Sequence, residues 1–245
     1  MPLPWKTIDR VSTEEGLLEL RQRGEGDFLM TIGGRVLMNS MAHRSEIALG
    51  RLACSAIRSR SRPSVLLGGL GMGYTLRAVL DGLPASGSVV VAELNPIVID
   101  WCKGPLSILT ANATGDSRVT LVPGDVSPVI ERYAVDPGLG KLDAVVLDLY
   151  SGPSGGDHKR DHPLYGSVAI DRVRRALKAG GVFAVWGEDR DDGFHRRLTR
   201  GGFSVSGGKL SGGGPRHAVY LGKKIPASGR GPGTAITSRA IRKGR

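Results

Sequence analysis

Cysteine is scarce in this chain of 245 residues, which contains only Cys54 and Cys102. Two cysteines are too few for a disulfide framework, and they do not form a metal-ligand pattern. Long apolar runs are also missing, because no stretch reaches the roughly 18–20 residues that a membrane-spanning helix needs. The first ten residues lack the basic-then-apolar order of a secretory signal. We therefore expect a cytoplasmic protein that makes no membrane contact.

Acidic residues are absent after Asp192. Residues 193–245 carry 12 lysines and arginines, whereas residues 1–192 carry 22 basic and 23 acidic side chains. The formal net charge of +11 therefore arises in the C-terminal part alone. Residues 223–245 combine seven of these cations with Gly, Pro, Ser and Ala, and such a composition cannot build a core. We predict a disordered basic tail, which is more often solubilising than a contact for nucleic acid or another anionic surface.

Turn-rich pieces divide residues 5–38 into four short strands. They predict a small antiparallel β unit over residues 1–44. A helix over about residues 45–58 is expected to follow and to lead into the main domain.

Apolar runs and helical segments alternate from Ser64 to Arg200. Continuous apolar runs are typical of strands buried on both faces, and their alternation with helices indicates a parallel sheet. Two further strands, near residues 203–206 and 218–221, are predicted to form an antiparallel hairpin at the edge. The fold class that we predict for residues 45–222 is therefore α/β, a Rossmann-like, doubly wound and mostly parallel seven-stranded sheet.

A glycine-rich turn follows the first buried strand of this sheet and precedes a helix. Gly69, Gly71 and Gly73 allow positive φ and let a ligand approach the backbone. Glu93 ends the second strand, where an acid can accept hydrogen bonds from both ribose hydroxyls. Asp125 follows the third strand, where an acid can accept one from an adenine amino group. Together they predict a nucleoside site, and the spacing G-x-G-x-G disfavours NAD, whose fingerprint is G-x-G-x-x-G.

Six segments together resemble the spermidine synthase family, and more closely a bacterial branch labelled spermidine synthase-like. They are residues 68–77, 92–96, 116–119, 124–125, 142–148 and 176–181. The resemblance covers about residues 34–203 and implies a class I transferase that uses S-adenosylmethionine (AdoMet) or its decarboxylated form. It implies that Glu93 holds the ribose, that Asp125 holds the adenine, and that Asp148 assists deprotonation of an acceptor amine. It also implies a homodimer.

Three features depart from the aminopropyltransferases of this family. Met72 stands where those enzymes have an acid that anchors an ammonium, and a second acid is missing after Asp148. The family's Tyr-Gln-Glu or Tyr-His-Glu tripeptide is here Arg44-Ser45-Glu46. A buried ammonium needs a carboxylate partner, whereas Arg44 would repel it and would favour a ligand that has a carboxylate. The residues therefore favour intact AdoMet over decarboxylated AdoMet.

The function that we expect is an AdoMet-dependent methyl transfer to a small amine- or hydroxyl-bearing acceptor. Asp148 is the expected base or orienting acid, Tyr150 is expected to hydrogen-bond the acceptor, and Arg44 to contact the AdoMet carboxylate. A polyamine aminopropyltransferase is the first alternative, and a nucleic-acid-binding or RNA-modifying protein is the second. Against the second, residues 1–192 have a net charge of −1, and aromatic residues make up only 5% of the chain.

Metal-ligand residue types gather in Asp157-His158-Lys159-Arg160-Asp161-His162. The segment lies in a polar, glycine-rich stretch, so we expect a solvated gate over the site and no bound metal. Glu188, after the fifth parallel strand, is a weaker site candidate. We expect Trp101 to contribute to helix packing.

Overall fold

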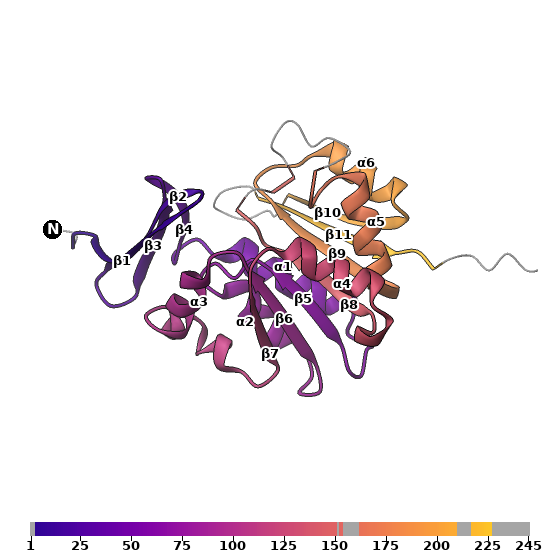
Figure 1. Ribbon diagram of the computed structural model, residues 1–245, viewed down its shortest axis with the longest axis horizontal. Coiled ribbons are helices and arrows are strands. Elements are labelled where there is room, and N and C mark those ends of the chain that lie inside the picture. Colours follow the sequence, from indigo (N-terminus) through magenta and orange to yellow (C-terminus); the bar gives the residue numbers. More distant parts are fainter. Residues whose placement is uncertain (1–2, 151, 154–161, 210–216, 227–245) are drawn as a thin grey trace, which may run out of the picture.

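The computed structural model describes residues 3–150, 152–153, 162–209 and 217–226. They form a large α/β unit with a smaller all-β sheet on one flank (Figure 1). Among the described residues, no helix is long and apolar enough to cross a membrane.

The small sheet is antiparallel and follows chain order. Its strands are β1 (Lys6–Thr13), β2 (Gly16–Arg23), β3 (Asp27–Ile32) and β4 (Arg35–Asn39). Alternate residues of β2 and β3 are buried, as expected for strands that pack on one face. These side chains, among them Leu18, Leu20 and Phe28, join an apolar cluster that continues into the main domain. The four predicted strands are confirmed, whereas the division at residue 44 stays a prediction.

The main sheet has seven strands in the order β10-β11-β9-β8-β5-β6-β7. The parallel strands are β5 (Ser64–Gly68), β6 (Ser88–Glu93), β7 (Val119–Pro123), β8 (Leu142–Leu147) and β9 (Leu177–Gly187). The antiparallel pair at one edge is β10 (Phe203–Lys209) and β11 (Ala218–Lys224). All six residues of β8 are buried, which explains its continuous apolar run in the sequence.

Helices cover both faces of this sheet, so the predicted doubly wound fold is confirmed. One apolar core includes residues of α1 (Arg44–Ala56), α2 (Tyr74–Gly82) and α3 (Pro96–Lys103). The other includes residues of α4 (Val126–Val135), α5 (Ser167–Ala176) and α6 (Asp192–Arg200). Within β8, Ala144 and Val146 join the first core, and Val145 and Leu147 join the second. The connections contain short 3-10 helices η1 (Ser107–Thr110), η2 (Ala113–Gly115) and η3 (Pro137–Leu139).

The first two residues of the predicted basic tail belong to the main sheet. Lys223 and Lys224 are the last residues of β11, where they are paired with β10. The Nζ of Lys224 also donates hydrogen bonds to the carbonyls of Arg174, at 2.7 Å, and Leu177, at 2.6 Å. These bonds satisfy carbonyl groups near the C-terminal end of α5. The remainder of the predicted tail, residues 227–245, lies outside the described residues.

Truncation after Gly222 is expected to lower the melting temperature, whereas truncation after Pro226 is expected to leave it nearly unchanged. The shorter protein loses the end of β11 and both hydrogen bonds of Lys224. We expect this loss to cost about 2 kcal/mol, or roughly 4–8 °C for a domain of this size. Thermal unfolding followed by circular dichroism measures both truncations. A large destabilisation after Pro226 would show that residues 227–245 belong to the fold.

Candidate functional site

A cavity of about 540 Å³ lies where the carboxyl ends of β5, β6, β7 and β8 meet the N-terminal sheet. Open α/β sheets bind their ligands at this end of the strands. The volume is within the range of small-molecule sites. Its lining includes five carboxylic acids and one arginine: Glu15, Glu46, Glu93, Asp125, Asp148 and Arg35.

The glycine-rich turn between β5 and α2 forms one wall. Gly69 has a φ of +86°, and a Cβ atom there would lie 2.2 Å from the carbonyl oxygen of Asp148. Gly71 has a φ of +53°, and a Cβ atom there would lie 2.9 Å from Sδ of Met38. Both positions therefore require glycine for conformation and for space. Gly69 and Gly71 line the cavity, while Gly73 is the N-cap of α2 and packs beside Thr110.

Glu93 connects the end of β6 to this turn. Its side chain accepts hydrogen bonds from the backbone N–H groups of Leu70, at 2.8 Å, and Asn95, at 2.9 Å. Burial raises the pKa of Glu93, and the backbone hydrogen bonds oppose that rise. An ionised carboxylate has about four acceptor positions, so two hydrogen bonds leave room for the two hydroxyls of a ribose.

Asp125 lies in the short turn between β7 and α4, directly before the helix. Its Oδ1 accepts a hydrogen bond from the N–H of Ser127, at 2.8 Å, so the residue caps α4. It also lines the cavity, as the nucleoside prediction requires. The capping role is a second reason for an acid at this position.

Asp148 follows β8 and is held by α2. The hydroxyl of Thr75 donates to its Oδ2, and the residue belongs to the cavity lining. The pKa of Asp148 is raised to about 7, mainly by burial and in smaller part by the charge of Glu46, and the Thr75 hydrogen bond limits the rise. A carboxyl group that titrates near neutral pH suits a general base.

Glu46 is a site residue that the sequence reasoning missed. It lies in the first turn of α1, is 7% exposed, and lines the same cavity as Asp148. Ser45 Oγ donates to its Oε2 at 2.6 Å, and its backbone carbonyl accepts from Thr75 Oγ1 at 3.2 Å. The Glu46 charge acts on Asp148, so we call Glu46 and Asp148 the carboxyl pair. The only sequence signal for Glu46 is its place in Arg44-Ser45-Glu46.

The two residues that favoured intact AdoMet lie outside this lining. Arg44 is an exposed residue at the start of α1, and Met72 is fully buried with its N–H donating to Sδ of Met38 at 3.1 Å. The arginine that does line the cavity is Arg35, at the start of β4. Contact of Arg44 with an AdoMet carboxylate therefore stays a prediction that this lining does not support.

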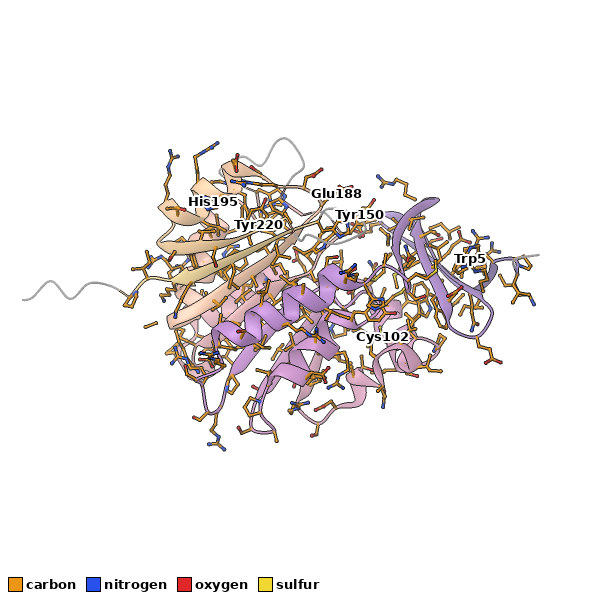
Figure 2. The ribbon with its side chains drawn as sticks, turned by 180° about the vertical axis from the view of Figure 1, so that it is seen from behind. Trp5, Cys102, Tyr150, Glu188, His195 and Tyr220 are labelled. Carbon is orange, nitrogen blue, oxygen red and sulfur yellow. The ribbon has the colours of Figure 1, made fainter. Side chains whose placement is uncertain are left out.

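The remaining candidates divide between the cavity and the surface. Tyr150 lines the cavity and is 51% exposed, whereas Glu188 is exposed and outside the lining (Figure 2). His162 also lines the cavity, but residues 157–161 lie outside the described residues. The packing role of Trp101 is confirmed, because it is 2% exposed and its Nε1 donates to Oδ2 of Asp9 at 2.7 Å.

No protein-family model matches the sequence, and no curated protein matches it. Solved structures do match. A spermidine synthase in complex with the transition-state analogue AdoDATO has a TM-score of 0.69 and 17% identity, over 89% of this chain and 72% of that chain. The spermidine synthase from Thermotoga maritima has a TM-score of 0.67 and 17% identity, over 89% of this chain and 73% of that chain. The chain therefore shares the fold of these spermidine synthases, as its sequence motifs predict.

Proposed function

We propose that the protein transfers an aminopropyl group from decarboxylated AdoMet to an amine. The observation that carries this proposal is the charge of the cavity, which has five carboxylic acids and one guanidinium in its described lining. Decarboxylated AdoMet has a sulfonium and an ammonium, and an amine acceptor is also a cation near neutral pH. Intact AdoMet would add a carboxylate to this acidic surface. The likeness to spermidine synthases supports the same choice.

The nucleoside part of the donor fits the wall formed by Gly69, Gly71, Glu93 and Asp125. Glu93 would accept from the ribose hydroxyls, and Asp125 from the adenine amino group. The two glycines let the backbone approach the donor closely. With the nucleoside held at this wall, the sulfonium would lie towards the carboxyl pair.

The acceptor would bind at the carboxyl pair. Two acids from distant segments can hold an ammonium there, because its positive charge offsets their mutual repulsion. Asp148 orients the nitrogen, and the pair takes up one proton from it. The nitrogen lone pair then attacks the methylene next to sulfur, the C–S bond breaks, and its electron pair stays on sulfur to give a neutral thioether. Each turnover releases one proton in total.

Methyl transfer from intact AdoMet is the second candidate, and Arg35 is the observation that favours it. A guanidinium in the cavity lining is a suitable partner for the carboxylate of AdoMet. It is one cation among five acids, so we rank this function second.

Product analysis tests the proposal. The protein is incubated with decarboxylated or intact AdoMet and a panel of amines that includes putrescine and spermidine, and the products are identified by mass spectrometry. We expect the mass of an aminopropyl group on an amine with the decarboxylated donor. Methylated products that form only with intact AdoMet would refute the proposal in favour of the second candidate.

A further inference from the structure

A chain of hydrogen bonds leads from the cavity to the start of β11. Oε2 of Glu46 accepts from Ser45 Oγ at 2.6 Å, and Ser45 Oγ lies 2.8 Å from Nδ1 of His217. Helix α1 packs against β11, which brings together residues that are 172 positions apart in the sequence. This hydrogen-bond chain therefore depends on tertiary packing, and no local sequence motif predicts it.

The serine hydroxyl has one hydrogen, so the directions of the two bonds are linked. When Glu46 is ionised, Ser45 donates to Glu46 and accepts from the Nδ1–H of His217. When Glu46 holds a proton, both bonds can reverse, so that Glu46 donates to Ser45 and Ser45 donates to Nδ1. The change from one arrangement to the other moves one proton between Glu46 and the imidazole.

The hydrogen-bond chain runs from a buried end to a more exposed end, which gives the proton movement a direction. Ser45 and Glu46 are each 7% exposed, whereas His217 is partly exposed. The His217 ring lies edge-on to Trp186, a residue of the cavity lining, with their centroids 4.8 Å apart. The chain thus joins a buried carboxyl group in the cavity to an imidazole that water can reach.

We infer that Ser45 and His217 form an exit path for the proton that the acceptor amine loses, with Glu46 as its entrance. This inference rests on the proposed transfer to an amine. The acceptor ammonium gives a proton to the carboxyl pair, and Glu46 passes it to Ser45 Oγ as the serine's own proton moves to Nδ1 of His217. The imidazolium ring then turns towards water and loses the Nδ1 proton there, so that it returns with a free Nδ1 and the relay is ready for the next turnover. Ser45 and His217 are positioning residues, because they act through Glu46.

Other ionisable groups around Glu46 do not offer the same route. Tyr74 of α2 stacks on His43 and stays protonated near neutral pH, because burial and the charge of Glu46 raise its pKa to about 12. The hydrogen-bond path from Asp148 stops at Thr75. The Thr75 hydroxyl has the backbone carbonyl of Glu46 as its other neighbour, and a carbonyl cannot pass a proton on.

Two substitutions interrupt the chain, and two controls match them. Ser45→Ala removes the shared hydroxyl, and Ser45→Thr keeps it. His217→Asn removes the titrating ring but retains a donor near the Nδ1 position. His195→Asn makes the same exchange at an exposed histidine of α6, away from Tyr150 and the cavity (Figure 2). Steady-state kinetics with decarboxylated AdoMet and the best amine are measured for each variant from pH 6 to pH 10.

We expect Ser45→Ala and His217→Asn to lower kcat by about 10- to 100-fold near pH 7, with KM for the donor unchanged. The loss should shrink towards pH 10, because the amine then arrives already deprotonated. Added imidazole should restore part of the activity of His217→Gly. The kcat values of Ser45→Thr and His195→Asn should stay within about twofold of the wild-type value, because both variants retain the relay.

The connection also has a readout that needs no turnover. The chemical shifts of the His217 ring nitrogens, measured by NMR, should change in Glu46→Gln, because the substitution alters the partner to which the Ser45 hydroxyl donates. Unchanged His217 ring shifts, or a kcat loss in Ser45→Ala that neither high pH nor Ser45→Thr reduces, would overturn the relay alone. A wild-type protein that transfers nothing to any amine would instead overturn the proposed function, and the relay with it.

Discussion

Asp148→Asn is expected to lower kcat by about 10²–10⁴-fold and to leave donor affinity nearly unchanged. The substitution keeps the shape of the side chain and a hydrogen-bond partner for Thr75, but it removes the charge and the proton acceptor. The acceptor amine then loses one member of the carboxyl pair and its orienting anion. Steady-state kinetics measure the change in kcat, and calorimetric titration measures donor affinity separately. A large loss of donor affinity would place Asp148 in the donor site instead.

The same variant is expected to be more stable than the wild type above pH 7. Burial holds the pKa of Asp148 at about 7, above its ordinary value of 3.8, so the folded protein binds more protons than the unfolded chain between these two values. The wild type therefore loses stability as the pH rises through this window, and an asparagine does not. Melting temperatures at pH 4 and pH 8 should show an advantage for Asp148→Asn only at pH 8.

Asp81→Asn is a suitable control for both measurements. Asp81 is an acid of α2 whose side chain is 64% exposed and paired with Arg77. Exposed pairs of this kind contribute little, so we expect neither a loss of kcat nor a pH-dependent gain in stability. An equal gain in both variants would mean that general charge repulsion, and not the burial of Asp148, causes the effect.

Glu93→Ala is expected to weaken donor binding by about 10- to 100-fold, since a hydrogen bond to a charged group contributes about 1.5–3 kcal/mol. The carboxylate also accepts from Leu70 and Asn95, so its loss loosens the glycine-rich turn as well. Calorimetric titration of the donor measures the change. Asp125→Ala is the comparison, and there we expect a smaller loss of affinity together with about 1 kcal/mol of stability from the helix cap.

A donor without its 2′-hydroxyl separates these two roles of Glu93. If Glu93 holds the ribose, the wild type binds this donor more weakly, whereas Glu93→Ala binds both donors alike. The same penalty in both proteins would mean that Glu93 acts only on the turn.

The part of the site that could be predicted from the sequence is the part built from consecutive residues. Gly69 and Asp125 come just after strands and Glu93 ends one, and parallel strands bring their carboxyl ends to one edge. The apolar runs and the turns between them were sufficient to identify these strands. Position along a strand therefore determined which residues reach the cavity.

The remaining site residues depend on side-chain directions and tertiary contacts, which cannot be predicted from the sequence. Residues two apart on a helix point about 200° from each other, and the cavity lining includes Glu46 but not Arg44 of this turn of α1. Met72 matches a family position, but its side chain is buried, while Gly69 and Gly71 before it line the cavity. Glu15 and Arg35 reach the cavity only because the small sheet packs against the main domain.

The most direct test of the account is a calorimetric titration of the protein with decarboxylated and with intact AdoMet under the same conditions. We predict that the decarboxylated donor binds at least about tenfold more tightly, a difference of about 1.4 kcal/mol, because the carboxylate of the intact donor meets an acidic cavity. The difference should shrink in Glu46→Gln. Equal affinities, or tighter binding of intact AdoMet, would contradict the account.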